Sequence, residues 1–121
     1  MRDETRKLIM RLAYKLFEHA WENCIYEDEE LNIAVSLIEG ALIIEDYRVH
    51  HVHVIFFRDD ETALITANEL IERYENDRNM SIDEFIESFA ERLVTFYLEP
   101  RVFKVYRHKH SQTVSERGRS T

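Results

Sequence analysis

The chain has 121 residues, a length that fits one domain with its own hydrophobic core. Its single cysteine excludes a disulfide within the chain, and no run of about 20 apolar residues is present, so we expect a cytoplasmic protein without a membrane span. Two glycines and one proline argue against a glycine-rich phosphate loop or a flexible linker. The opening sequence MRDETRKLIM also lacks the apolar core of a secretory signal.

Charge is distributed unevenly along the chain, whose formal net charge is −8 at pH 7. Acidic residues outnumber basic ones between Asp59 and Glu99, whereas the segment after Pro100 is basic. The basic residues of that segment are Arg101, Lys104, Arg107 and Lys109. An acidic body suits a basic protein partner, and a basic segment interleaved with aromatic residues suits nucleic acid. Ordinary solvated faces are the alternative explanation for both features.

Hydrophobic periodicity predicts a first helix, in which Leu8, Leu12 and Leu16 form an apolar stripe that continues to Cys24. We expect Cys24 to act as a small buried hydrophobic residue on this helix rather than as a nucleophile. His19 lies at the boundary of the stripe and is expected at the surface or packed, not as a metal ligand.

Two extended segments follow. Residues 31–46 alternate between apolar and small or polar residues, which predicts a strand with a bulge or bend at Gly40. Residues 48–57, RVHHVHVIFF, are rich in β-branched and aromatic residues and predict a second strand. Together they predict a long hairpin at the centre of an antiparallel sheet.

A second helix is predicted over residues 59–77. Asp59 or Asp60 provides its N-cap, and its predicted buried face is formed by Leu64, Ala67, Ile71 and Tyr74.

The start of a third helix is marked by the capping box of Ser81 and Glu84, with Met80 able to pack on Phe85. Its predicted apolar face continues through Phe85, Phe89, Leu93 and Tyr97, and Pro100 ends the helix.

The order of elements predicts an α+β fold. We expect an antiparallel sheet built on the long hairpin plus a C-terminal strand at residues 101–109, with three helices packed on one face. Residues 1–110 would form a single domain, and residues 111–121 a flexible basic tail. Because the second face of such a sheet needs cover, we also expect a homodimer.

Three histidines lie in the predicted strand RVHHVHVIFF. His51 and His53 are two residues apart and therefore share a face, so both imidazoles can bind one divalent metal, while His50 points to the opposite face. The pattern HVHVIFF resembles the metal motif of the HUH-type endonucleases. The sequence YRHK, from Tyr106 to Lys109, is similar to the nucleophile motif of the same family.

The resemblance implies a metal-dependent single-strand DNA endonuclease or replication initiator. In such an enzyme His51 and His53 would bind the metal, Tyr106 would attack a DNA phosphate and Lys109 would assist electrostatically. The chain departs from the family pattern because the family carries its tyrosine on a helix, whereas RVFKVYRHK predicts a strand.

Two other readings of the histidines remain open. Histidine at intermediate burial is common in strands, which makes His51 and His53 plausible structural residues. Alternatively, His108 and His110 share a face of the predicted last strand and would join them around zinc.

No complete catalytic set is evident beyond this resemblance. We therefore expect in the first place a small interaction or accessory protein, of the kind that viruses use, with a protein partner and no cofactor. It would act through its acidic surface, by binding a basic partner or by imitating nucleic acid. The endonuclease with its divalent metal is the alternative function.

Overall fold

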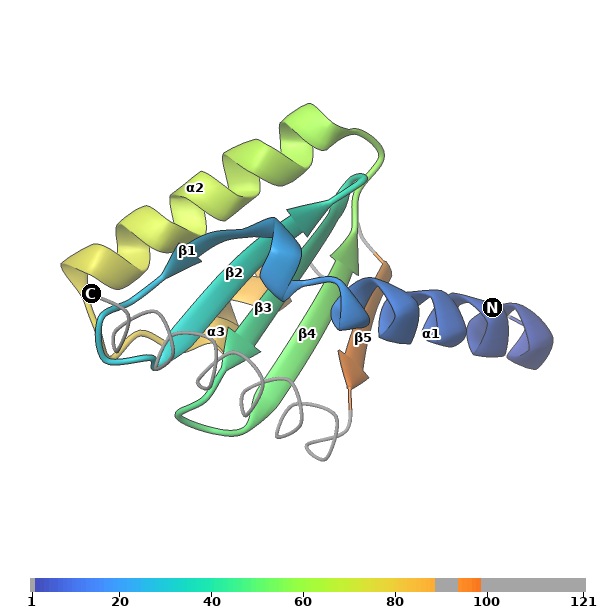
Figure 1. Cartoon of the computed structure of the whole chain (residues 1–121), viewed down its shortest axis with the longest axis horizontal. Coiled ribbons are helices and arrows are strands. Elements are labelled where there is room, and N and C mark those ends of the chain that lie inside the picture. The colour runs from blue at the N-terminus through green and yellow to red at the C-terminus, as the bar shows by residue number, and fades with distance from the viewer. Residues whose placement is uncertain (1, 89–93, 99–121) are drawn as a thin grey trace, which may run out of the picture.

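The computed structural model describes residues 2–88 and 94–98. Its strands form one five-stranded antiparallel sheet in the order β1-β2-β3-β4-β5 (Figure 1). The α+β class predicted from the sequence is confirmed. The elements are, in chain order, α1 (Asp3–Glu18), the 3-10 turn η1 (Trp21–Asn23), β1 (Cys24–Glu27), β2 (Ile33–Ile38), β3 (Ala41–Asp46), β4 (His51–Phe56), α2 (Asp60–Asn76), α3 (Ile82–Glu87) and β5 (Val94–Leu98).

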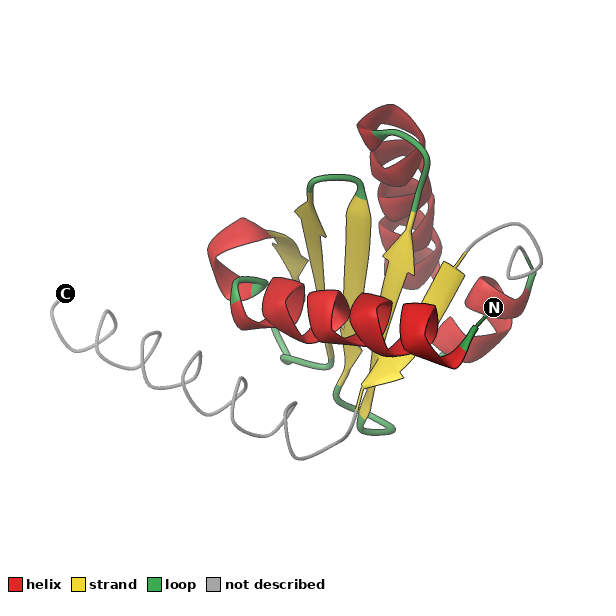
Figure 2. Ribbon diagram, turned by 90° about the vertical axis from the view of Figure 1, so that its right-hand side faces the viewer, coloured by secondary structure: helices red, strands yellow, loops and turns green. Residues whose placement is uncertain are grey.

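Helices cover both faces of the sheet, so the prediction of three helices on one face is confirmed only in part: α2 and α3 share one face, and α1 covers the other. In one hydrophobic cluster, Ala13 and Phe17 of α1 pack on strand residues such as Ile43 and Val54. A second cluster packs α2 and α3 on the opposite face of the strands, as Figure 2 shows. Every residue of β3 is buried, because the central strand contributes side chains to both clusters. The open sheet face that suggested a homodimer is absent from the described residues, and the dimer itself stays a prediction.

The predicted long hairpin is divided at Gly40. Glu39 and Gly40 both have positive φ, 44° and 79°, and form a two-residue turn between paired Ile38 and Ala41. Two successive left-handed residues give the turn type that matches the twist of a hairpin, so the chain reverses here instead of bulging. A Cβ atom at residue 40 would lie 3.3 Å from Asp60 Oδ1, which also favours glycine. The central part of the sheet is therefore built from three strands, β2 to β4.

The first helix is shorter than predicted. It ends at Glu18, and Cys24 begins strand β1, which the sequence analysis did not predict. Ala13 and Phe17 are its buried residues, whereas Leu8 and Leu12 are 62% and 47% exposed. The buried residues of α1 therefore each follow a leucine of the predicted stripe by one position. The small side chain of Ala13 lets the helix approach the sheet closely.

The second helix agrees closely with its prediction. Helix α2 begins after Asp59, whose side chain accepts a hydrogen bond from Thr62 N at 2.6 Å. Its buried face contains Ala67 and Tyr74 as expected, but Leu64 is 44% exposed. The burial of Ala63 and Leu70 shows that the helix is turned slightly from the predicted orientation.

The third helix also begins as predicted, because Ser81 Oγ accepts a hydrogen bond from Glu84 N at 3.2 Å. It ends at Glu87, however, and the segment that was expected to continue it contains β5, paired with β4. The sequence VTFYL of β5 has β-branched and aromatic residues, and the edge of β4 offers it backbone partners. The strand predicted at 101–109 and the tail at 111–121 lie outside the described residues.

Asp28 ties the end of α2 to the loop before β2. Its Oδ1 accepts hydrogen bonds from the backbone N–H groups of Asn32 and Ile33 at 2.6 and 2.9 Å. Its Oδ2 accepts from the Tyr74 hydroxyl at 2.7 Å and lies 3.4 Å from Arg78. Asp28 is one of four consecutive acidic residues at positions 27–30, but it is only 3% exposed, so its carboxylate is structural. Among the described helices, none combines the length and the apolar character needed to cross a bilayer.

Candidate metal centre

Strand β4 places His51 and His53 on the sheet face that α2 and α3 cover. Ile55, the next residue on that face, belongs to the cluster under these helices, whereas Val52 and Val54 pack on the α1 side. The two imidazole rings are 5.8 Å apart between centroids and nearly perpendicular, at 80°. The prediction that the two histidines share a face is therefore confirmed. His50 instead lies in the turn before β4, with a positive φ of 57°, so its predicted place on the opposite face of the strand is wrong.

Asp83, from the first turn of α3, completes the cluster. Its carboxylate lies 3.1 Å from His51 Nδ1 and 2.9 Å from His53 Nε2. Helix α3 is oriented by Ile82 and Ile86, which are buried against the sheet. Because Asp83 is three residues before Ile86, it lies on the same side of the helix and reaches the start of β4.

The donor set fits a divalent metal ion. One ligand atom from each of His51, His53 and Asp83 lies within 4.8 Å of the other two. Metal–ligand bonds of about 2.0–2.2 Å place neighbouring ligand atoms roughly 3.0–3.4 Å apart. A modest rotation of the three side chains is enough to bring their ligand atoms to this spacing. Two imidazoles and one carboxylate suit zinc, manganese or iron, and three protein ligands leave coordination positions for water or substrate.

The surroundings of His53 favour the neutral form of its imidazole. Burial lowers the pKa of His53, the charge of Asp83 opposes this effect, and the neighbouring His51 lowers the pKa further. The side chain of His53 is 12% exposed, compared with 32% for His51 and 43% for Asp83. Since metals bind the neutral imidazole, a lowered pKa prepares His53 as a ligand at neutral pH.

Several other residues proposed from the sequence cannot be compared with this cluster, or lie elsewhere in the described part of the chain. Tyr106 and Lys109, the histidines at 108 and 110, and the other basic residues of that segment lie outside the described residues. Cys24 is half-buried on β1, where its Sγ contacts Tyr26 O at 3.3 Å. Burial raises the pKa of the Cys24 thiol, which agrees with the expectation that it is no nucleophile.

Sequence reasoning missed two positions near the histidines. Asp83 was not predicted to lie beside the histidines, because a capping box locates the start of a helix but does not determine which strand the helix covers. Tyr97 was assigned to a helix, yet it lies on β5 as the register partner of His53. The strand-forming sequence VTFYL was the available signal for Tyr97.

Comparison with known proteins adds no relative: no family model, curated protein or solved structure matches the chain. The functional argument therefore rests on the residues of this chain and their geometry.

The charge of Asp83 can be tested through the titration of His53. We expect NMR titration to give His53 a pKa below the ordinary histidine value, and Asp83→Asn to lower it further, because the carboxylate favours the imidazolium form. Glu87→Gln, at the exposed end of α3, is the matched control and should leave the titration unchanged. A higher pKa for His53 in Asp83→Asn would contradict this account of the site.

Proposed function

We propose that this chain binds a divalent metal at His51, His53 and Asp83 and uses it to act on phosphodiester bonds of single-stranded nucleic acid. The observation that carries the proposal is the convergence of these ligand atoms within 4.8 Å, with the acid supplied by a separate helix. A pair of strand histidines alone does not define a metal site, and Asp83 supplies the third donor.

The three residues of the centre differ in exposure, which determines the side from which a substrate can reach the metal. When bound, the metal supplies positive charge that stabilises the charge developing on a phosphoryl group. His53 forms the buried end of the site, whereas the side chains of His51 and Asp83 are 32% and 43% exposed. A substrate therefore approaches from the side of His51 and Asp83.

The position of the basic segment supports nucleic acid as the substrate. Leu98, the last residue of β5, is the register partner of Val52, which lies between the two histidines in sequence. The basic segment at 101–110 begins three residues later in the sequence, and an extended chain covers at most about 11 Å over that distance, so Arg101 is tethered within reach of the metal centre. Basic residues attract a phosphate backbone, and Phe103 and Tyr106 are of the type on which single-stranded bases stack. This arrangement offsets the acidic character of the rest of the chain.

Two tyrosines are candidates for a nucleophile. The resemblance to the HUH-type endonucleases favours Tyr106, and the pairing of Tyr97 with His53 favours Tyr97. In either case the phenol loses its proton to solvent and its oxygen forms a bond to phosphorus, while the bond from phosphorus to the leaving oxygen breaks. The leaving oxygen takes up a proton, and the cut strand end remains bound to the tyrosine.

Metal binding should stabilise the folded chain. With manganese or zinc at about 100 times the dissociation constant, we expect the free energy of unfolding to rise by about 2.7 kcal/mol, seen as an increase in the melting temperature. His53→Gln and Asp83→Asn should remove most of this increase, and lowering the pH should weaken it because protons compete for the imidazoles.

The matched control for metal binding is His19→Gln, which removes an exposed histidine that lies beside Glu22 and outside the cluster. Equal stabilisation of the wild type and Asp83→Asn would rule out this centre.

Cleavage of labelled single-stranded DNA tests the catalytic part of the proposal. With manganese present, we expect the wild type to give a cut strand and a covalent protein–DNA adduct. Substituting the true nucleophile, by Tyr106→Phe or Tyr97→Phe, should reduce both by roughly 10³-fold. Tyr14→Phe on α1 is the control and should cleave normally. Absence of any product from the wild type, or an adduct that persists when both tyrosines are replaced, would refute tyrosine-based cleavage.

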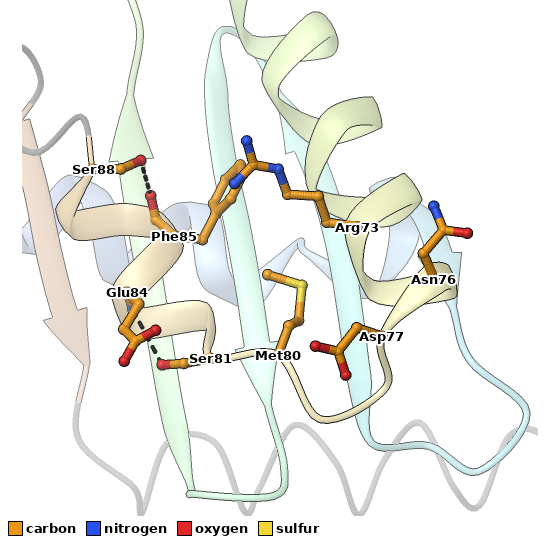
Figure 3. Close-up of a pocket in the computed structure, with 8 residues that line it drawn as sticks. All are labelled: Arg73, Asn76, Asp77, Met80, Ser81, Glu84, Phe85 and Ser88. Atoms are coloured by element: carbon orange, nitrogen blue, oxygen red, sulfur yellow. Dashed lines mark hydrogen bonds between the residues drawn. The ribbon is translucent and has the colours of Figure 1, made fainter.

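A second candidate function, docking of a basic protein partner without a cofactor, is favoured by the pocket between α2 and α3. This pocket has a volume of about 540 Å³ and is shown in Figure 3. The acidic Asp77 and Glu84 line it together with the apolar Met80 and Phe85. Such a lining suits a segment that combines basic and apolar side chains, which supports the proposal that an acidic surface of this chain binds a basic partner.

Salt dependence tests this second function. We expect a synthetic peptide of alternating lysine and phenylalanine residues to bind the protein and to lose affinity as salt is raised, since the attraction is between charges of opposite sign. Glu84→Gln should weaken binding, and Glu61→Gln, at the other end of α2, should not. An affinity that ionic strength leaves unchanged would remove the electrostatic premise.

A further inference from the structure

The lining of the pocket between α2 and α3 combines acidic side chains with large apolar ones. Figure 3 shows Met80 lying between the two helices, with Asp77 on the α2 side and Glu84 on α3. Ser88 Oγ donates a hydrogen bond to Phe85 O at 2.6 Å at the far end of α3. A ligand in this pocket therefore has both carboxylates and apolar surface within its lining.

The single arginine that lines the pocket does not neutralise the two carboxylates of the lining. Arg73 donates a hydrogen bond to Glu69 at 2.8 Å, and its guanidinium lies 5.3 Å from the centroid of the Phe85 ring. With this positive charge matched by Glu69, the charges of Asp77 and Glu84 dominate the lining. The pocket consequently selects a positively charged ligand with apolar groups.

A segment of this composition leaves the sheet close to the pocket. Leu98 pairs with Val52, and the neighbouring His51 contacts Asp83, which directly precedes Glu84 of the pocket. Figure 1 shows that β5, the outermost strand, ends at the same end of the sheet as the turn between β3 and β4. An extended chain spans about 17 Å over five residues, from Leu98 to Phe103, whereas a helix with its side chains is roughly 10–12 Å across. Residues after Leu98 can therefore pass α3 and reach the pocket.

The segment also matches the pocket in charge and in pattern. Residues 101–110, RVFKVYRHKH, contain four arginines and lysines and no acid, interleaved with apolar residues. We propose that residues 101–110 occupy the pocket between α2 and α3 of the same chain, with their basic side chains at Asp77 and Glu84. This inference rests on the second function proposed above and names its occupant.

Occupation of the pocket would regulate nucleic-acid binding by the basic segment. The same lysines and arginines are used in both interactions, so a polyanion and the pocket compete for them. Helix α3 carries Asp83 of the metal centre beside Glu84 of the pocket, so release of the segment takes place next to the metal centre.

Limited trypsin digestion of the full chain tests the proposal, because trypsin cleaves after lysine and arginine. Cleavage after Lys104 and Arg107 should be slower than cleavage after Arg117, which lies beyond the proposed contact and serves as an internal reference. The double variant Asp77→Asn, Glu84→Gln should accelerate cleavage after Lys104 and Arg107 by about tenfold, since two partly exposed ion pairs are lost. High salt should have the same effect in the wild type.

The matched control is the double variant Glu61→Gln, Glu72→Gln, which removes the same charge from exposed positions of α2 outside the pocket lining and should not alter cleavage. Equal cleavage after Lys104, Arg107 and Arg117 in the wild type would overturn the proposal, even if the synthetic peptide still bound the pocket and so upheld the docking function. Protection that disappears on dilution, together with a dimer in sedimentation, would also overturn it and assign the segment to a second copy of the chain.

Discussion

The alternation of side chains along β4 is the constraint on which the rest of the structure depends. Strand β4 is paired on both edges and covered on both faces, so each of its residues belongs to one side of the sheet. Val52 and Val54 face α1, whereas His51, His53 and Ile55 face α2 and α3. A slip of one residue in register would move both histidines under α1, where no acid from α3 could reach them. The register that buries the two valines is thus also the register that forms the candidate metal centre.

Helix α3 connects the two candidate functions. It has only six residues, too few to be stable alone, and is held by the burial of Ile82, Phe85 and Ile86. One side of this short helix supplies Asp83 to the histidines, and another supplies Glu84 and Phe85 to the pocket. A ligand that binds at either place makes contacts to the same element. The candidate metal centre and the acidic pocket are therefore neighbours through a single turn of helix rather than separate regions of the chain.

Charge separation gives these neighbouring sites opposite preferences. The pocket is lined by Asp77 and Glu84 and favours positive groups, while a metal held by His51, His53 and Asp83 would favour phosphate. The basic segment after β5 is complementary in charge to the pocket, and it has the same sign of charge as a metal bound at the histidines. The proposed action on nucleic acid therefore requires the metal and the basic segment to act together, and the pairing of Leu98, the last residue of β5, with Val52 is the observation that supports this.

The sequence by itself determined the features that depend on neighbouring residues. The β-branched run at 51–56 specifies a strand and therefore places His51 and His53 on one face, and the side chains of Asp59 and Ser81 specify where α2 and α3 begin. Only the tertiary structure decided the features that depend on distant partners. The pairing edge of β4 turned the end of the predicted third helix into β5, and packing on the sheet selected Ala13 and Phe17 over the leucine stripe of α1. The meeting of Asp83 with the histidines is of this second kind, because it requires α3 to lie over β4, and no local pattern encodes that contact across some thirty residues.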